Sequence, residues 1–381
     1  MSGPLDGVRV IELSGLGPAP FAAMMLSDLG AEVIRVDRAS AVRGGNPDAP
    51  PADVLNRGRR SIGIDLKNPD GVAALLRLVE SADALIEGFR PEVCERLGIG
   101  PDACHERNPA LVYGRMTGWG QDGPWAQRAG HDINYIALSG TLSMIGRKGE
   151  APVPPINLLG DFGGGGMLLA VGVLAGIINA RSAGTGQVVD AAMVDGAALL
   201  ASMMHGMKAM GMWGGGRGAN LLDTGAHFYD VYETADAKYI SLGALESHFY
   251  AEMLERLGFA DDELAGQLDA TRWDQSRAKI AARVAEKTRR EWDEIFTDSD
   301  ACYAPVLNAD EAGEHPQLAA RETFVEIAGV SQPAPAPRFS QTPSDVPTPP
   351  AHAGQHTDAV LADNGFTAEE IADLRGSGAI A

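Results

Sequence analysis

Residues 8–36, VRVIELSGLGPAPFAAMMLSDLGAEVIRV, contain a short apolar run, a helical pattern and a second apolar run. Val8–Leu13 predicts a strand, Pro20–Ala31 predicts a helix that stops at Gly30, and Glu32–Val36 predicts the next strand. Strand, helix and strand in this order form the unit from which parallel sheets are built. The stretch therefore predicts an α/β fold.

The same alternation continues through the first third of the chain. Asn68–Ala82 predicts a helix with Asn68 as its cap and Pro69 in its first turn. Further strands are predicted at Ser61–Leu66, Ala84–Phe89 and Leu111–Trp119. This order of elements predicts a doubly wound parallel sheet.

The chain beyond about residue 180 has a different pattern. Residues 190–225 predict a long helical stretch that ends in a glycine-rich loop, 227–245 predict a hairpin, and helices follow to about 320. Gln332–Pro350 is rich in proline and predicts an extended strap, followed by two short helices. We expect a large domain of residues 1–190 with 325–381, a linker of 191–224, and a smaller α+β domain of 225–324.

The bulk composition limits the partners that we expect. A net charge of -20 argues against a nucleic-acid partner, which needs a basic surface. The uncharged run Met167–Ala180 is shorter than the roughly 20 residues that span a bilayer, so we expect a buried core helix and no membrane partner. Cys94, Cys104 and Cys302 lack metal-ligand spacing and predict free, buried thiols. With no leader-like N-terminus, these features predict a cytoplasmic location and no metal site.

The loop SGLGPAP, Ser14–Pro20, follows the first predicted strand and resembles a dinucleotide-binding turn. Asp37 ends the next strand, where an acidic residue binds the ribose in NAD-dependent enzymes. Pro20 replaces the third glycine, however, and Pro18 removes an amide that a pyrophosphate would use. A dehydrogenase remains an open alternative at this point.

Basic residues follow successive predicted strands. Arg38, Lys67 and Arg90 stand at three strand ends, and Arg96 follows one short helix later. Ligands bind at the carboxyl ends of strands in such sheets, and gathered cations can bind several phosphates. The alternative is that these are scattered surface charges. That explanation suits a single residue better than four residues at equivalent positions.

Two titratable residues carry the chemistry that the sequence offers. Asp161 precedes the glycines Gly163–Gly166 and is either a helix cap or a base or nucleophile beside amides that stabilise an oxyanion. Asn157, four residues earlier, can donate a hydrogen bond that orients Asp161. His131, in AGHDINYIALSG (129–140), is either a structural histidine or an acid/base.

A run of methionines follows in SMMHGMKAMGMW. Methionine at helical spacing indicates a core or a subunit contact, although a flexible methionine wall also accepts varied acyl chains. His205 lies within the run and is interpreted as structural. The methionines are Met203, Met204, Met207, Met210 and Met212.

Four segments together resemble the α-methylacyl-CoA racemases, a branch of the family III CoA-transferases. They are GPLDGVRVIELSGLGPAPFAAMMLSDLGAEVIRVDR, RMTGWGQDGPWAQRAGHDINYIALSG, PPINLLGDFGGGGM and GQVVDAAMVDGAALL. The similarity extends from about Pro4 to Pro343. It implies a large Rossmann-like domain completed by the strap, a small domain, and an interlocked homodimer with the active site between the large domain of one chain and the small domain of the other.

The resemblance also implies roles for individual residues. His131 and Asp161 correspond to the two acid/bases, and Glu246 corresponds to a glutamate that supports the histidine. Ser247 and His248 depart from the family's usual pattern beside Glu246, and Ala237 replaces a usual turn glycine. The implied coenzyme A contacts are Arg38, Ile64, Asp65, Leu66, Lys67, Gly88, Phe89, Arg90, Arg96, Gly130, His131, Asp132, Ile133, Asn134 and Tyr135.

The activity implied is racemisation of 2-methylacyl-CoA thioesters in lipid metabolism, by 1,1-proton transfer through an enolate. It requires no cofactor, because coenzyme A is part of the substrate. The histidine of GHDINY favours this interpretation over CoA transfer with Asp161 as nucleophile. A non-catalytic acyl-CoA-binding protein is a third alternative. Branched fatty acyl and sterol side-chain thioesters both suit the sequence.

Overall fold

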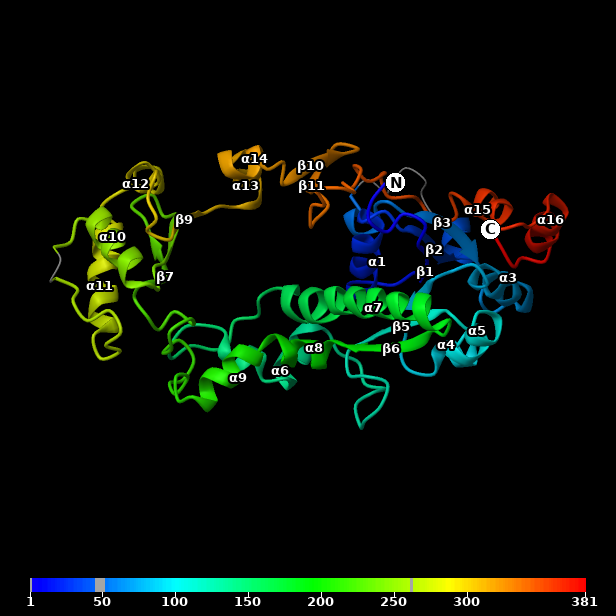
Figure 1. The fold of residues 1–381 in the computed structure, drawn as a ribbon, viewed down its shortest axis with the longest axis horizontal. Coiled ribbons are helices and arrows are strands. Elements are labelled where there is room, and N and C mark those ends of the chain that lie inside the picture. The colour runs from blue at the N-terminus through cyan, green and yellow to red at the C-terminus, as the bar shows by residue number, and fades with distance from the viewer. Residues whose placement is uncertain (1, 45–51, 261–262) are drawn as a thin grey trace. The chain divides into compact units, whose positions relative to one another are not determined.

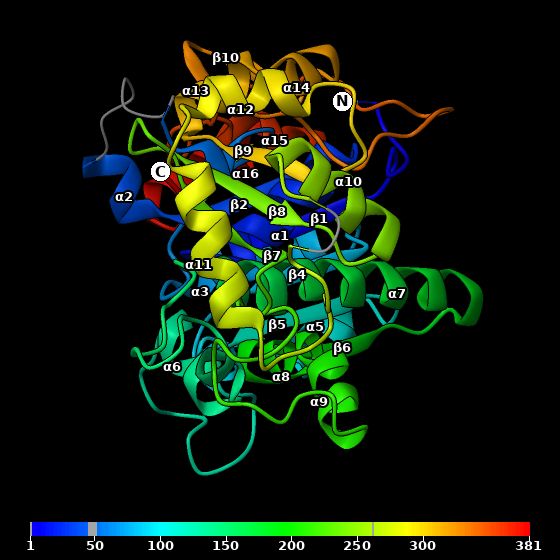
Figure 2. The ribbon, with the colours of Figure 1, turned by 90° about the vertical axis from the view of Figure 1, so that its left-hand side faces the viewer.

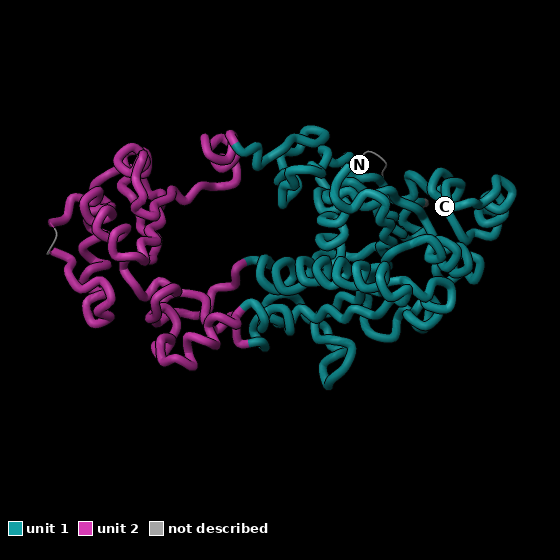
Figure 3. Tube along the Cα trace, in the orientation of Figure 1, with its two compact units in different colours: residues 1–139, 156–200, 321–381 teal, residues 140–155, 201–320 magenta. Residues whose placement is uncertain are grey.

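The computed structural model describes residues 2–44, 52–260 and 263–381, which form two compact units (Figure 3). The first unit comprises residues 1–139, 156–200 and 321–381, and the second comprises 140–155 and 201–320. The expected domain boundaries at residues 190, 224 and 324 remain a prediction, since a compact unit need not be an independently folding domain.

The first unit is built on a six-stranded parallel sheet with the strand order β3-β2-β1-β4-β5-β6 (Figure 1). This finding confirms the predicted α/β fold with a parallel sheet. Strand β1 is paired on one side with β2 and on the other with β4, so the chain changes direction across the sheet at this point. The strands are β1 (Arg9–Leu13), β2 (Glu32–Arg38), β3 (Arg60–Ile64), β4 (Ala84–Glu87), β5 (Val112–Thr117) and β6 (Gln187–Ala192).

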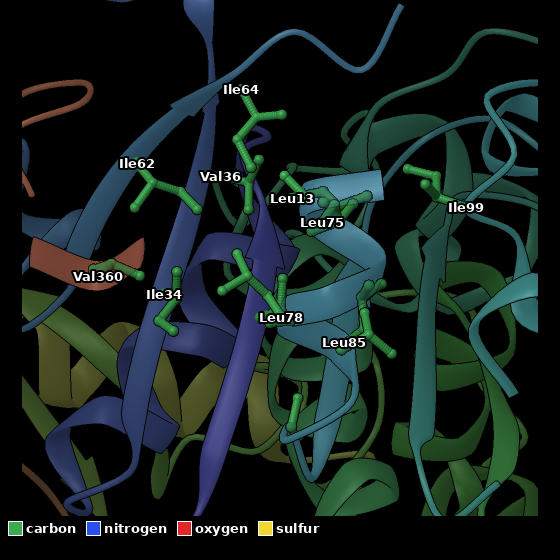
Figure 4. Close-up of a cluster of buried hydrophobic side chains, with 14 of the residues drawn as sticks. Leu13, Ile34, Val36, Ile62, Ile64, Leu75, Leu78, Leu85, Ile99 and Val360 are labelled. Atoms are coloured by element: carbon green, nitrogen blue, oxygen red, sulfur yellow. The ribbon is translucent and has the colours of Figure 1, made fainter. Parts of the chain in front are cut away.

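Both faces of this sheet are covered by apolar side chains from helices. One cluster joins Leu13 and Ile34 of the sheet to Leu75 and Leu78 of α3 (Pro69–Val79), as Figure 4 shows. The other cluster joins alternate strand residues to α1 (Pro18–Asp28) and α7 (Leu168–Ala183). Because neighbouring strand residues point to opposite faces, the nearly continuous apolar strands of the sequence bury both.

Shorter helices complete the first unit. The C-terminal residues return to the sheet, where α15 packs on β3 and Ile380 bridges to Ile64. A hairpin of β10 (Phe324–Ile327) and β11 (Val330–Pro333) takes up the first two residues of the predicted strap, Gln332 and Pro333. The remaining helices are α2 (Ala39–Gly44), η1 (Val54–Asn56), α4 (Val93–Arg96), α5 (Pro101–Arg107), α6 (Asp132–Leu138), α8 (Met193–Leu200), α15 (Thr357–Asp363) and α16 (Ala368–Gly376).

The glycine-rich segment folds as a π-helical stretch, η3 (Leu158–Met167), which continues directly into α7. The helix therefore starts well before the predicted Met167. Residues 158–183 are long and apolar enough to cross a membrane by length and composition, with 44% of the most apolar window buried. Core helices of soluble proteins pass the same test. Leu169 and Val173 face the core, whereas Val171 and Ile178 are exposed, so only one face matches the expected core helix.

The second unit contains a three-stranded antiparallel sheet and a separate apolar core. The predicted hairpin is present as β7 (Tyr229–Glu233) and β8 (Tyr239–Gly243), and α11 packs against β7 (Figure 2). The third strand, β9 (Tyr303–Val306), lies where only helices were expected. The helices are η2 (Thr141–Met144), α9 (Ser202–Ala209), α10 (Ser247–Leu257), α11 (Trp273–Val284), α12 (Arg289–Phe296), α13 (Ala309–Glu314) and α14 (Pro316–Ala320).

Two expectations from the sequence are wrong. Residues 190–225 do not form one long helical stretch, because β6 extends to Ala192 and the helices α8 and α9 are separated at Ala201. Cys94 and Cys104 are buried free thiols, but Cys302 is exposed. It precedes the edge strand β9, whose alternate residues face solvent.

Candidate active site

Two cavities lie at the carboxyl ends of the strands, beside the neighbouring strands β1 and β4, between which the strand order reverses. The first has a volume of about 540 Å³ and is lined by the ends of β1, β2 and β3. The second has a volume of about 680 Å³ and is lined by the start of α1, the loop after β4 and the end of β5. Phe89 lines both cavities. Open α/β sheets bind ligands at this position.

His131 lines the second cavity and caps the N-terminus of α6. Its backbone is extended, with φ of -135° and ψ of 174°, so the residue stands just outside the helix. The backbone amide of His131 donates to Asn134 Oδ1 at 3.0 Å, which fixes the turn into α6. The imidazole is exposed, as a group that exchanges protons with a substrate must be.

Asp161 lines the same cavity from the first turns of η3. Asn157 Nδ2 donates to Asp161 Oδ2 at 3.2 Å, the hydrogen bond that the sequence suggested. Burial raises the pKa of Asp161 above its usual 3.8, and this effect is partly offset by the hydrogen bond from Asn157. Gly17, with φ of 72°, brings the loop after β1 close to this carboxylate.

A second aspartate joins the two elements that carry these groups. Asp132 is 4% exposed, and its Oδ2 accepts hydrogen bonds from the backbone amides of Gly160 at 2.6 Å and Asp161 at 2.7 Å. We expected amides at the start of the glycine-rich helix to bind an oxyanion. These two amides already have a carboxylate acceptor, so that expectation fails for both of them.

The residues implied as coenzyme A contacts fall mainly into the two cavities. Those lining the first are Arg38, Ile64, Asp65, Leu66, Lys67 and Phe89. Those lining the second are Gly88, Phe89, Arg90, Gly130, His131 and Tyr135. Asn134 lines an adjoining hollow with Trp119 and Trp125. Asp132 is buried, Ile133 is 45% exposed, and Arg96 is exposed and paired with Glu92 at 3.6 Å.

The ribose ligand of the dinucleotide alternative, Asp37, lines the first cavity but has one carboxylate oxygen engaged by its neighbours. Asp37 Oδ2 accepts hydrogen bonds from Ser61 Oγ at 2.6 Å and from Arg35 Nε at 2.8 Å. This oxygen is therefore engaged within the sheet. No group of three or more His, Cys, Asp or Glu side chains suited to a metal ion occurs among residues 2–44, 52–260 and 263–381.

The remaining candidates lie in the second unit. Glu246 is exposed at the N-cap of α10. In the methionine run, Met207 is 5% exposed, whereas Met203, Met210 and Met212 are 57–68% exposed. His205 is also exposed and therefore lacks the buried surroundings of a structural histidine.

Sequence reasoning missed the two tryptophans beside the second cavity. Trp119 packs edge-on against both Trp125 and Tyr135, with ring centroids 5.0 and 4.7 Å apart. Arg128 lies 4.5 Å above the Trp125 ring. The two tryptophans in the quoted segment RMTGWGQDGPW were the available signal for this aromatic wall.

Comparison with known proteins places the chain in context. Residues 5–357 match the model of "CoA-transferase family III". The chain is 45% identical over 373 residues to "Alpha-methylacyl-CoA racemase" of Mus musculus and 44% identical over 374 residues to the Homo sapiens protein of that name, covering 97% of this chain and 96% of each relative. A solved CAIB/BAIF family protein from Brucella suis has a TM-score of 0.81 at 24% identity, covering 96% of this chain and all of that one, and supports the fold.

Proposed function

The chain belongs to CoA-transferase family III, and from this premise we propose that it interconverts the 2R and 2S forms of 2-methylacyl-CoA thioesters. The observation that carries the proposal is one cavity that contains both an imidazole, His131, and a carboxylate, Asp161. The adjoining cavity supplies Arg38 and Lys67 for the phosphates of coenzyme A.

The reaction requires two proton carriers. One group removes the proton from the carbon next to the thioester carbonyl, and the electron pair moves onto the carbonyl oxygen to give an enolate. The other group delivers a proton to the opposite face, and the carbonyl re-forms with inverted configuration. His131 and Asp161 are suited to these tasks, because imidazole and carboxylate side chains are the groups that most often serve as general acids and bases.

The surroundings of Asp161 raise its pKa, which suits it to proton transfer. Burial and the nearby carboxylate of Asp132 raise its pKa, while Asn157 and His131 lower it. A carboxyl group that gives up its proton less readily than usual is a better base toward carbon and a more available acid in the return step. The reaction proposed here needs no added cofactor, because the thioester itself acidifies the transferred proton.

The enolate oxygen needs hydrogen-bond donors that the amides of Gly160 and Asp161 do not offer, because both already donate to Asp132 Oδ2.

We also propose a homodimer. Met167, Val171 and Ile178 lie on one face of the η3–α7 helix and are 49–72% exposed, and Leu199 and Leu200 of α8 are more than half exposed. A patch of this kind on a water-soluble enzyme favours a subunit contact. A second copy would also supply a Glu246, the residue proposed to support His131.

The rival activity is CoA transfer, with Asp161 as a nucleophile that forms an acyl anhydride. The two reactions are distinguished by giving one epimer of a 2-methylacyl-CoA to the enzyme in deuterated water without an acceptor acid. Racemisation predicts loss of configuration with uptake of one deuterium at the α-carbon, measured by chiral chromatography and mass spectrometry. A thioester that stays unchanged until a free carboxylic acid is added would support transfer, and binding without either reaction would indicate a binding protein.

A further inference from the structure

The side chain of Arg115 connects two carboxylates at the ends of one short segment. Arg115 is on β5 and is only 7% exposed. Its Nε donates to Glu87 Oε1 at 3.0 Å, and its Nη1 and Nη2 donate to the two oxygens of Glu95 at 2.7 and 3.2 Å. Glu87 is the last residue of β4 and Glu95 belongs to α4, so one guanidinium holds both ends of residues 87–95.

Glu87 also shapes the start of this segment. It is 1% exposed, and its Oε2 accepts a hydrogen bond from the backbone amide of Phe89 at 2.6 Å. This contact fixes the turn that directs Phe89 between the two cavities. Further along, Glu92 has φ of 67°, a left-handed conformation that a residue with a side chain adopts only when its neighbours hold it.

The held segment contains residues that line the cavities, whereas the residues that hold it do not. Gly88, Phe89, Arg90 and Pro91 line the second cavity, and Phe89 and Val93 line the first. Glu87 and Arg115 line neither one. They can therefore act on a ligand only through the segment that they position.

We propose that Arg115 and Glu87 are positioning residues for coenzyme A, which set the affinity for its nucleotide end without touching the reacting carbon. The inference rests on the proposed function for the identity of the ligand. It predicts that their loss weakens the binding of coenzyme A while the chemistry at a short thioester continues.

The test uses two variants and a matched control. Arg115→Lys keeps the charge but cannot bridge both carboxylates, and Glu87→Gln keeps an acceptor for the Phe89 amide but removes the ion pair. The control is Arg57→Lys, because Arg57 is equally buried and forms a two-point pair with Asp28 at 3.1 and 2.5 Å, with neither residue lining either cavity. Circular dichroism and melting temperature first establish that each variant is folded.

The first measurement is the Kd of free coenzyme A by titration calorimetry. We expect Arg115→Lys to weaken binding about tenfold, and Glu87→Gln by a smaller factor, with no change in Arg57→Lys. The second measurement compares racemisation of a 2-methylacyl-CoA with that of the same acyl group on N-acetylcysteamine, which lacks the nucleotide. KM should rise for the coenzyme A thioester alone, and kcat should stay within about twofold on both.

Different outcomes separate the two proposals. Equal losses on both thioesters, unchanged Kd values, or a weaker Kd in Arg57→Lys as well would overturn the positioning role. If the wild-type protein binds coenzyme A but exchanges no α-proton on either thioester, the racemase proposal is refuted. The Kd values of free coenzyme A would then still test the positioning role of Arg115. A variant that fails to fold is replaced in the comparison by the other.

Discussion

Asp132 Oδ2 accepts a hydrogen bond from the backbone amide of Asp161 at 2.7 Å, so a buried carboxylate links the start of α6 to the turn that carries Asp161. Asp132 directly follows His131. The position of the imidazole relative to the second carboxylate is therefore constrained by two short hydrogen bonds, this one and the one from Gly160. Gly160 has no side chain because a Cβ there would lie 2.6 Å from Asp132 Oδ2.

We expect Asp132→Ala to lower kcat by about 100-fold with a smaller effect on KM, because displacement of a catalytic group by about 1 Å costs this much. Asp132→Asn retains an acceptor oxygen and should lose less. Racemisation rates of both epimers provide the measurement. A loss in Asp132→Asn as large as that in Asp132→Ala would show that the charge, and not the link, is what matters.

Replacement of His131 should separate the two faces of the substrate. In His131→Ala, Asp161 can still exchange a proton on its own face, so one epimer should take up deuterium without inversion. Racemisation should fall by about 10²–10⁴-fold, the range for loss of a general acid or base. Asp161→Asn should show the opposite preference. Equal exchange of both epimers in His131→Ala would remove the proposed division of roles.

Asn157→Ala should move the acid limb of the kcat/KM profile to higher pH. Burial, the largest effect, raises the pKa of Asp161, and the hydrogen bond from Asn157 lowers it. Removal of that hydrogen bond leaves only the weaker effect of His131 against the raising effects, so Asp161 keeps its proton to a higher pH. The exposed Asn179 on α7 supplies a control, since Asn179→Ala should leave the profile unchanged. A limb that moves to lower pH would contradict this assignment.

The sequence predicted the parallel sheet well because its signals are local. Apolar runs at β1, β2 and β4 and the cap at Asn68 each specify their element within a few residues; the structure shows the Asn68 side chain accepting from the amide of Asp70. Strand β6 escaped prediction because it is an edge strand that is mostly exposed and contains Asp190.

The candidate site was predictable only in its residue types. His131 and Asp161 could be singled out by their glycine neighbours, but the Asp132 link joins residues 28 and 29 positions apart. The arginine that holds residues 87–95 likewise depends on the pairing of β4 with β5. Such contacts follow from how the strands pair, which periodicity does not encode.

The stability of the folded protein should depend on pH through Glu87. Burial raises its pKa to about 7, against the opposing effects of the Phe89 amide and Arg115. The folded state therefore holds a proton that the unfolded chain has lost above its ordinary pKa of 4.5, and stability from this group falls as pH rises from about 4.5 to 7. The side chain introduced by Glu87→Gln is uncharged at every pH, so the melting temperature of the variant minus that of the wild type should increase from pH 5 to pH 8. The increase corresponds to at most about 3 kcal/mol in the free energy of unfolding.

Glu95→Gln provides the matched comparison. The titratable and charged groups that interact electrostatically with Glu87 are Cys94, Tyr113, Glu95 and Arg115. Of these, Glu95 has a lowered pKa, because the effect of its burial is outweighed by the lowering effects, of which the hydrogen bonds from Arg115 are the largest. Its carboxylate is ionised throughout this range, and its effect should not change between pH 5 and pH 8. A parallel trend in both variants would indicate a general pH effect.

Close packing of two glycines should make the helix beside Asp161 sensitive to a single methyl group. A Cβ at Gly196 of α8 would lie 1.8 Å from the carbonyl oxygen of Gly164 in η3, and backbone atoms cannot move aside as a flexible side chain can. We expect Gly196→Ala to destabilise the protein by about 1–3 kcal/mol or more, measured as a lower melting temperature. Gly206 lies in α9, and a Cβ added there would have nothing within 4 Å, so Gly206→Ala should be neutral or stabilising by about 0.5–1 kcal/mol. Equal effects of the two substitutions would mean that α8 and η3 do not pack this closely in solution.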